Sequence, residues 1–189
     1  MRRGVINILR TWDHATDAER LEGMNWYQSA HVECTKLHPS IETACGVVAS
    51  VSPGLKWAVN IEAARRIISG ESTDGLGRIW PRNYAKAYAI LAGESPDEVL
   101  GRKKQSGHKV RAFYANLVNP ANWVSVCVDG HAYGVWCGER IPLDAIPSLT
   151  RKQYANIASD YTRVADKLAV LPNQVQAVTW IAWRRVIGL

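Results

Sequence analysis

Cysteine, phenylalanine and long apolar runs are all scarce in this chain. Its four cysteines, spread over 189 residues, are too few for a disulfide scaffold, so we expect free thiols in a reducing cytoplasm. No run of 18 or more apolar residues occurs, which argues against a membrane-spanning helix. Arg10 also interrupts the N-terminal segment before any long apolar stretch, so we expect no signal peptide.

The aromatic composition is unusual because a single Phe stands beside eight Trp and seven Tyr. Tryptophan and tyrosine combine a flat face with a polar group, and they suit surfaces that stack on bases or line polar clefts. Most of them are nevertheless expected to pack in the core. The composition is therefore compatible with nucleic-acid binding without requiring it.

Acidic residues are absent from residues 99–128, although the whole chain carries 17 of them against 23 Lys and Arg, a net charge of +6. Such a stretch attracts polyanions, and each phosphate it neutralises adds salt-sensitive affinity. A solvated basic loop without a partner is the alternative. We predict nucleic-acid contact through the basic residues of this stretch: Arg102, Lys103, Lys104, His108, Lys109 and Arg111.

Helical signals cover almost the whole chain. Ser40 and Thr150 are typical N-caps, and Gly70 is typical of a helix end. Residues 123–128 have strand propensity, but no partner strand is evident. The sequence predicts an all-α fold with helices over residues 16–37, 41–51, 57–69, 83–91, 97–100, 109–117, 150–171 and 172–185.

Three possible chemical sites are weakly supported. Cys127, His131 and Cys137 provide only three zinc ligands without a paired-cysteine motif, so we expect no metal. Nothing local marks a cysteine nucleophile beside a histidine base. Ser106 and Lys109 have the spacing of some serine acyl transferases, but the other motifs of that class are missing.

A fourth arrangement is more informative. Gly107, His108 and Lys109 open a helix after the basic loop, where backbone amides and the helix dipole favour a phosphate. Asp129 follows in the motif VDGH, and it is the only carboxylate between Glu98 and Glu139. Neighbouring cations favour the charged form of such a group, which suits it to stabilise positive charge on a sugar. Asp129 can also act as the N-cap of a helix that starts near residue 130.

The arrangement GHK…VDGH resembles the helix-hairpin-helix DNA glycosylases (the HhH-GPD superfamily). The segments TACGVVAS and SPGLKWAVN are similar to that family's early helix pair. The C-terminal PNQVQAVTW is similar to the last helix of small viral and bacterial members, so the resemblance covers about residues 40–185. Gln105 stands where the family has its first hairpin glycine, and Ser52-Pro53 stands where its wedge glutamine is expected.

The resemblance implies a two-lobed helical fold in one domain of residues 1–189, with one lobe of about 40–117 and a second from 1–39 and 118–189. It implies that Asp129 is the catalytic carboxylate, and that Lys109 is either a nucleophile forming a Schiff base or a phosphate contact. A base flipped out of double-stranded DNA would lie in the cleft between the lobes. We place four residues at that pocket: Trp57, Asn60, Tyr114 and Trp136.

The expected function is therefore that of a DNA glycosylase acting on a damaged or modified base, including a hypermodified viral base in antiviral defence. No cysteine cluster follows Trp136, so no iron–sulfur cluster or other cofactor is implied. We expect a cytoplasmic monomer that binds DNA and no membrane. Two alternatives stay open: a non-catalytic helical DNA-binding module, and an enzyme that remodels modified thymine in viral DNA.

Overall fold

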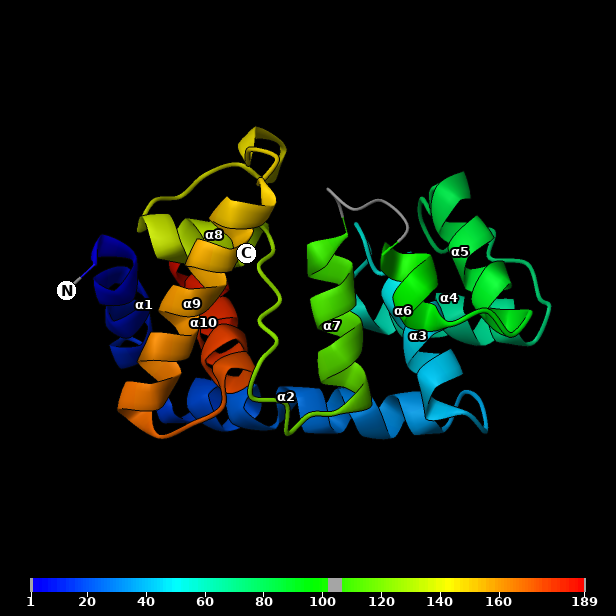
Figure 1. The fold of residues 1–189 in the computed structure, drawn as a ribbon, viewed down its shortest axis with the longest axis horizontal. Helices are drawn as coiled ribbons and strands as arrows, with labels where there is room; N and C mark the ends of the chain where they lie inside the picture. Colours follow the sequence, from blue (N-terminus) through cyan, green and yellow to red (C-terminus); the bar gives the residue numbers. More distant parts are fainter. Residues whose placement is uncertain (1, 102–106, 189) are drawn as a thin grey trace. The chain divides into compact units, whose positions relative to one another are not determined.

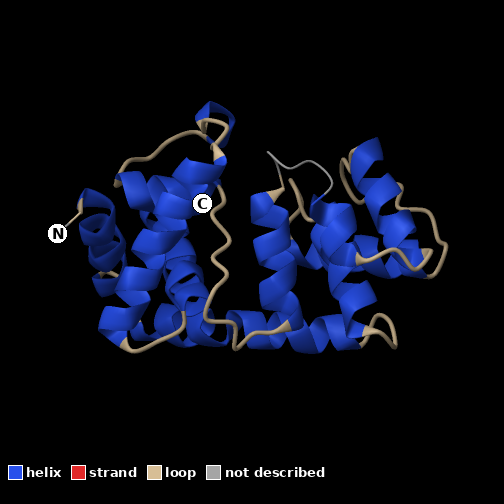
Figure 2. Ribbon diagram, viewed as in Figure 1, coloured by secondary structure: helices blue, strands red, loops and turns tan. Residues whose placement is uncertain are grey.

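The structure is built from helices. The computed structural model describes residues 2–101 and 107–188, and these residues contain ten α-helices, one short 3₁₀ helix and no strand (Figures 1 and 2). The prediction of an all-α fold is therefore confirmed. The elements are α1 (Arg3–Asp13), α2 (Asp17–Thr35), α3 (Ile41–Val51), α4 (Trp57–Ile68), α5 (Pro81–Leu91), α6 (Pro96–Gly101), α7 (His108–Val118), α8 (Gly130–Cys137), η1 (Leu143–Ala145), α9 (Arg151–Leu168) and α10 (Pro172–Val186).

The predicted helix starts are confirmed where a capping side chain marks them. The hydroxyl of Ser40 accepts a hydrogen bond from the Thr43 amide at the start of α3. Thr150 and Gln153 form a reciprocal capping box at the start of α9. Gly70 has a φ of 72° just past α4, as expected of a residue that ends a helix.

Helix α1 is an element that the sequence analysis missed. Val5, Ile8 and Trp12 are buried and form its apolar face. Asn7 and Thr11 are buried between them, so the apolar periodicity is interrupted. None of the helices in residues 2–101 and 107–188 is long and apolar enough to cross a membrane.

The chain divides into two compact units. Unit 1 comprises Met1–Gln28 and Pro120–Leu189, and unit 2 comprises Ser29–Asn119. The boundary falls inside α2, which contributes residues 17–28 to unit 1 and residues 29–35 to unit 2. The lobe expected over about residues 40–117 lies within unit 2.

Unit 1 has a core formed by α1, α8, α9 and α10. Tyr161 and Ile157 of α9 are fully buried beside Val135 of α8 and Val178 of α10. Gly23 of α2 approaches this core closely, since a Cβ atom at this position would lie 2.5 Å from the Cα of Val178. A glycine inside α2 is thus explained by the close crossing of two helix backbones.

Unit 2 is organised around α3. Every residue of this helix from Ala44 to Val51 is buried, as expected of a helix that is apolar on all sides. Helices α4, α5, α6 and α7 all contact it. Gly46 allows this packing, because a Cβ atom there would lie 3.0 Å from Pro96 and 3.2 Å from Ile90.

Candidate active site

Asp129 lies at the start of α8 in unit 1. Its Oδ1 atom accepts a hydrogen bond of 2.8 Å from the amide of Ala132, so Asp129 is the N-cap of the helix, as predicted. The residue is half-buried, and within the part of the chain that the structure describes no hydrogen bond reaches its Oδ2 atom. The cap therefore fixes the carboxylate while one of its oxygens stays available to a ligand.

The backbone before Asp129 is tightly turned and is held by a tyrosine. The amides of Val128 and Asp129 bond to the carbonyls of Val126 and Cys127, which gives two successive three-residue turns. The hydroxyl of Tyr154, on α9, donates to the Val126 carbonyl at 2.8 Å and accepts from the Val128 amide at 3.1 Å. Burial raises the pKa of Tyr154, so this hydroxyl keeps the proton that it donates.

A second tyrosine holds the first turn of α8. Tyr161 is fully buried, and its hydroxyl donates to the Ala132 carbonyl at 3.0 Å. Both tyrosines belong to the buried face of α9, seven residues apart, together with Ile157 and Val164. They were not predicted from the sequence, although an apolar stripe that contains two tyrosines is a signal for buried hydroxyl groups that need partners.

Aromatic rings from α2 and α10 lie close to α8. The His131 ring packs edge-on against Trp180, with ring centroids 6.3 Å apart, and Trp26 packs edge-on against the same indole at 6.4 Å. The guanidinium of Arg184 lies 4.6 Å from the Trp180 ring centroid. This half-buried cluster was also missed, and the spacing of Trp180 and Arg184, one turn apart on α10, is its only sequence signal.

Trp136, a predicted pocket residue, packs within unit 1. Its indole nitrogen donates to the carboxylate of Asp160 at 3.0 Å. Gly4 of α1 lies against the same ring, since a Cβ atom there would lie 2.0 Å from the indole nitrogen. Asp160 is 3% exposed and also pairs with Arg2, so this buried carboxylate, which was not predicted from the sequence, has partners in Trp136 and Arg2. A role for Trp136 in a base pocket stays a prediction.

The predicted DNA-binding residues that the structure describes lie at the start of α7 in unit 2. Gly107 precedes the helix with a φ of 102°, and a Cβ atom there would lie 2.7 Å from the Leu100 carbonyl oxygen. His108 and Lys109 occupy the first two positions of α7 and are half-buried. Arg111 pairs with Asp97 at 3.5 Å. The predictions for Arg102, Lys103 and Lys104 lie outside the described residues.

Unit 2 also contains the other three predicted pocket residues. Trp57 packs edge-on against Phe113 with ring centroids 6.4 Å apart, and Tyr114 follows Phe113 on α7. Burial, together with the charge of Asp97, raises the pKa of Tyr114 to about 12, which keeps it protonated at neutral pH. Asn60 is 2% exposed, and within residues 2–101 and 107–188 its side-chain oxygen has no hydrogen bond. Asp129, Lys109 and the pocket residues thus belong to two different units.

The cysteines are free thiols. Cys127 is buried and Cys137 is half-buried, and burial raises the pKa of Cys137. Across residues 2–101 and 107–188, no group of three or more histidine, cysteine, aspartate or glutamate side chains is arranged to hold a metal ion.

Fold and site together define an all-α protein of two helical units, in which an aspartate caps a short helix held by two tyrosines. The chain belongs to a family of unknown function, DUF7178, which matches residues 1–186. No curated protein and no solved structure matches the chain.

Proposed function

We propose that the protein is a DNA N-glycosylase that removes a damaged or modified base, with Asp129 as its catalytic carboxylate. The observation that carries the proposal is the arrangement of this side chain, whose Oδ1 atom is fixed by the Ala132 amide while no described residue bonds to Oδ2. A carboxylate held in one orientation with an available oxygen is suited to charge stabilisation.

The chemistry follows from the charge of this group. When an N-glycosidic bond breaks, its electrons leave with the base, and positive charge develops on the sugar, as in other glycoside cleavages. The Asp129 carboxylate stabilises that charge and accepts the proton of the water that attacks C1′. The products are a base that has taken up a proton and an abasic sugar.

We propose that the segment between α6 and α7 contacts the DNA backbone. Gly107 opens α7, and the first amides of a helix bind phosphate oxygens well. Lys109 either contacts a phosphate or attacks C1′ through its amine to form a Schiff base. Arg102, Lys103 and Lys104 are proposed to add charge to the same contact.

The base pocket is proposed to include Trp57, Asn60 and Tyr114 of unit 2. The unbonded side-chain oxygen of Asn60 is a buried acceptor that a base amino group would satisfy. Aromatic side chains suit stacking on a bulky base, so a hypermodified viral base is the substrate class that we propose, with antiviral defence as the role.

The experiment that tests the proposal compares Asp129→Asn with the parent protein. Asparagine caps helices about as well as aspartate, whereas alanine loses about 1 kcal/mol of stability. We therefore expect Asp129→Asn to keep the stability of the parent but to release base at least 100-fold more slowly. The matched control is Asp166→Asn, an exposed position on α9, which is expected to retain full activity. Parental activity of Asp129→Asn would refute the assignment.

The role of Lys109 is tested by borohydride trapping. A Schiff base reduced by borohydride leaves a stable protein–DNA adduct, and Lys109→Ala would abolish it. Base release at the parental rate in Lys109→Ala, without an adduct in the parent, would show that Lys109 is not the nucleophile and that water attacks C1′.

A non-catalytic DNA-binding module is the second candidate. It is favoured by the fact that helix capping alone accounts for the hydrogen bond of Asp129. It predicts salt-sensitive DNA binding that survives Asp129→Asn, with no base released from any DNA. Remodelling of modified thymine predicts instead a change in the mass of a base that stays attached to the DNA.

A further inference from the structure

Aromatic and basic side chains gather on α5 and the loop before it in unit 2. Trp80, Tyr84 and Tyr88 recur at every fourth residue and therefore lie along one side of the helix. Trp80 is 40% exposed and Tyr88 is 52% exposed, whereas Tyr84 is half-buried. We call these three residues, with Arg78 and Arg82, the α5 surface; the glycosylase proposal uses none of them.

The charge of this surface is positive. Residues 75–93 contain Arg78, Arg82 and Lys86 but no Asp or Glu. The guanidinium carbon of Arg78 lies 3.9 Å from the centroid of the Trp80 ring, and that of Arg82 lies 5.7 Å from it. Among the described residues, no ion pair joins either arginine to a carboxylate. Both can therefore pair with an external anion.

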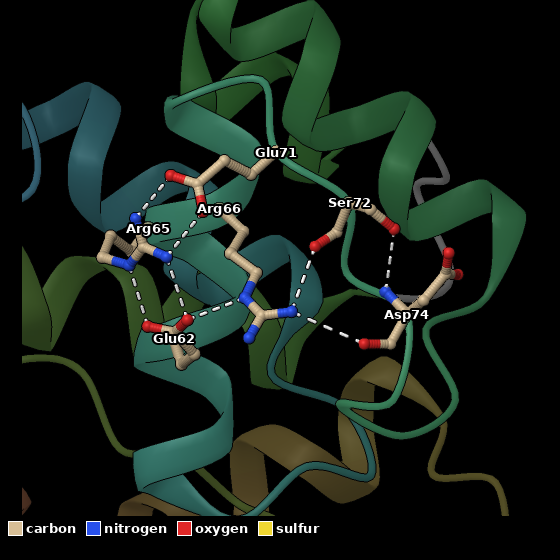
Figure 3. Close-up of polar contacts among 6 residues, drawn as sticks. All are labelled: Glu62, Arg65, Arg66, Glu71, Ser72 and Asp74. Atoms are coloured by element: carbon tan, nitrogen blue, oxygen red, sulfur yellow. Dashed lines mark hydrogen bonds and ion pairs between the residues drawn. The ribbon is translucent and has the colours of Figure 1, made fainter.

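In the preceding segment Glu62 and Glu71 are paired with arginines, as Figure 3 shows, whereas the figure draws no bond to the carboxylate of Asp74. Glu62 binds Arg65 at 2.8 Å and Arg66 at 2.7 Å, and Glu71 binds Arg65 at 2.7 Å. Hydrogen bonds from Arg65 and Arg66 lower the pKa of Glu62 to about 2, so it stays ionised and paired at neutral pH. Arg66 also donates to the carbonyl of Ser72 at 3.2 Å. This network holds the loop that leads to Trp80 in place, and its two glutamates balance the charge of its two arginines.

The aromatic rings are held in a defined geometry. The Tyr84 hydroxyl bonds to the hydroxyl of Thr73, in the fastened loop. The rings of Tyr84 and Tyr88 are nearly parallel, with an interplanar angle of 18° and centroids 6.5 Å apart. Exposed base faces are available on single strands and are covered in a duplex.

We propose that the α5 surface binds single-stranded nucleic acid. Bases stack on Trp80 and Tyr88, and Arg78 and Arg82 contact the phosphates. In the free protein Arg78 covers one face of Trp80, and on binding it moves to a phosphate while a base takes its place. The binding does not rest on Asp129 or on base release, so it stands or falls independently of the glycosylase proposal.

The test measures the anisotropy of a fluorescent oligothymidylate and of a duplex of equal length with the full-length protein. We expect Trp80→Ala and Tyr88→Ala each to weaken single-strand binding by roughly 5- to 150-fold, the range found for lost base stacking. Trp80→Phe keeps a flat ring and should retain most of the affinity. Trp123→Ala, which removes a tryptophan 58% exposed in unit 1, is the matched control and should bind like the parent.

Thermal unfolding of each variant checks that the fold is intact, which is expected because Trp80 and Tyr88 are exposed. Parental single-strand binding by folded Trp80→Ala and Tyr88→Ala would overturn the proposal. An equal loss of duplex and single-strand binding would also overturn it, since it would show a contact without base stacking. Asp129→Asn should leave oligothymidylate binding unchanged, whatever happens to base release.

Discussion

Replacing Tyr154 by phenylalanine removes the hydroxyl group that holds the backbone before Asp129, while the ring that packs in unit 1 remains. The hydroxyl donates to the Val126 carbonyl at 2.8 Å and accepts from the Val128 amide at 3.1 Å. In the variant, the Val128 amide still bonds to the Val126 carbonyl across the three-residue turn. The substitution therefore removes the hydrogen bond from Tyr154 to the Val126 carbonyl and one of the two hydrogen bonds of the Val128 amide. We expect a loss of about 1–2 kcal/mol of stability.

For a chain of this length, that loss corresponds to a fall in Tm of roughly 2–8 °C, measured by circular dichroism. Displacement of the Asp129 carboxylate should slow base release by more than the loss of folded protein explains. A shift of about 1 Å at a catalytic group can lower the reaction rate about 100-fold. Asp166→Asn, an exposed change on the same helix α9, is the control and should match the parent. A Tyr154→Phe protein with parental Tm and parental base release would refute the positioning role of Tyr154.

Two further predictions concern stability. Gly107→Ala places a side chain at a φ of 102° and 2.7 Å from the Leu100 carbonyl oxygen, so we expect a loss of about 2–3 kcal/mol in urea unfolding. Gly70→Ala has a similar positive φ in open space, and it should cost about 1 kcal/mol; equal losses would show that the close contact does not matter. Hydrogen bonds from the Arg185 side chain and a backbone amide lower the pKa of Glu19 to about 2, so its contribution to stability is complete above about pH 4.5 and is lost as the pH falls toward 2. The stability difference between the parent and Glu19→Gln should therefore shrink over that range in unfolding experiments, and a difference that does not vary with pH would contradict the assignment.

The sequence predicts the parts of the fold that local chemistry controls. Ser40 and Thr150 cap helices where expected, because their hydroxyl groups satisfy amides only three residues away. Asp129 was likewise recognised as an N-cap, since the next residues offer it a free amide. The missed helix α1 lacks such a signal, because its N-cap residue Arg2 makes no side-chain capping bond and buried polar residues interrupt its apolar face.

The surroundings of Asp129 could not be predicted in the same way. Tyr154 and Tyr161 bond to groups 26 to 29 residues away, and only tertiary packing brings them together. The same holds for Trp136, whose indole donates to the carboxylate of Asp160, 24 residues away in the sequence. Sequence spacing predicts which residues share a helix face, but it does not predict which element packs against that face.

The most direct test of the glycosylase proposal is to incubate the protein with genomic DNAs that carry different base modifications and to measure the mass of any base set free. Catalysis by Asp129 predicts a free base of defined mass from at least one DNA, and its loss in the Asp129→Asn protein. The absence of a released base from every DNA, or equal release by Asp129→Asn, would contradict it.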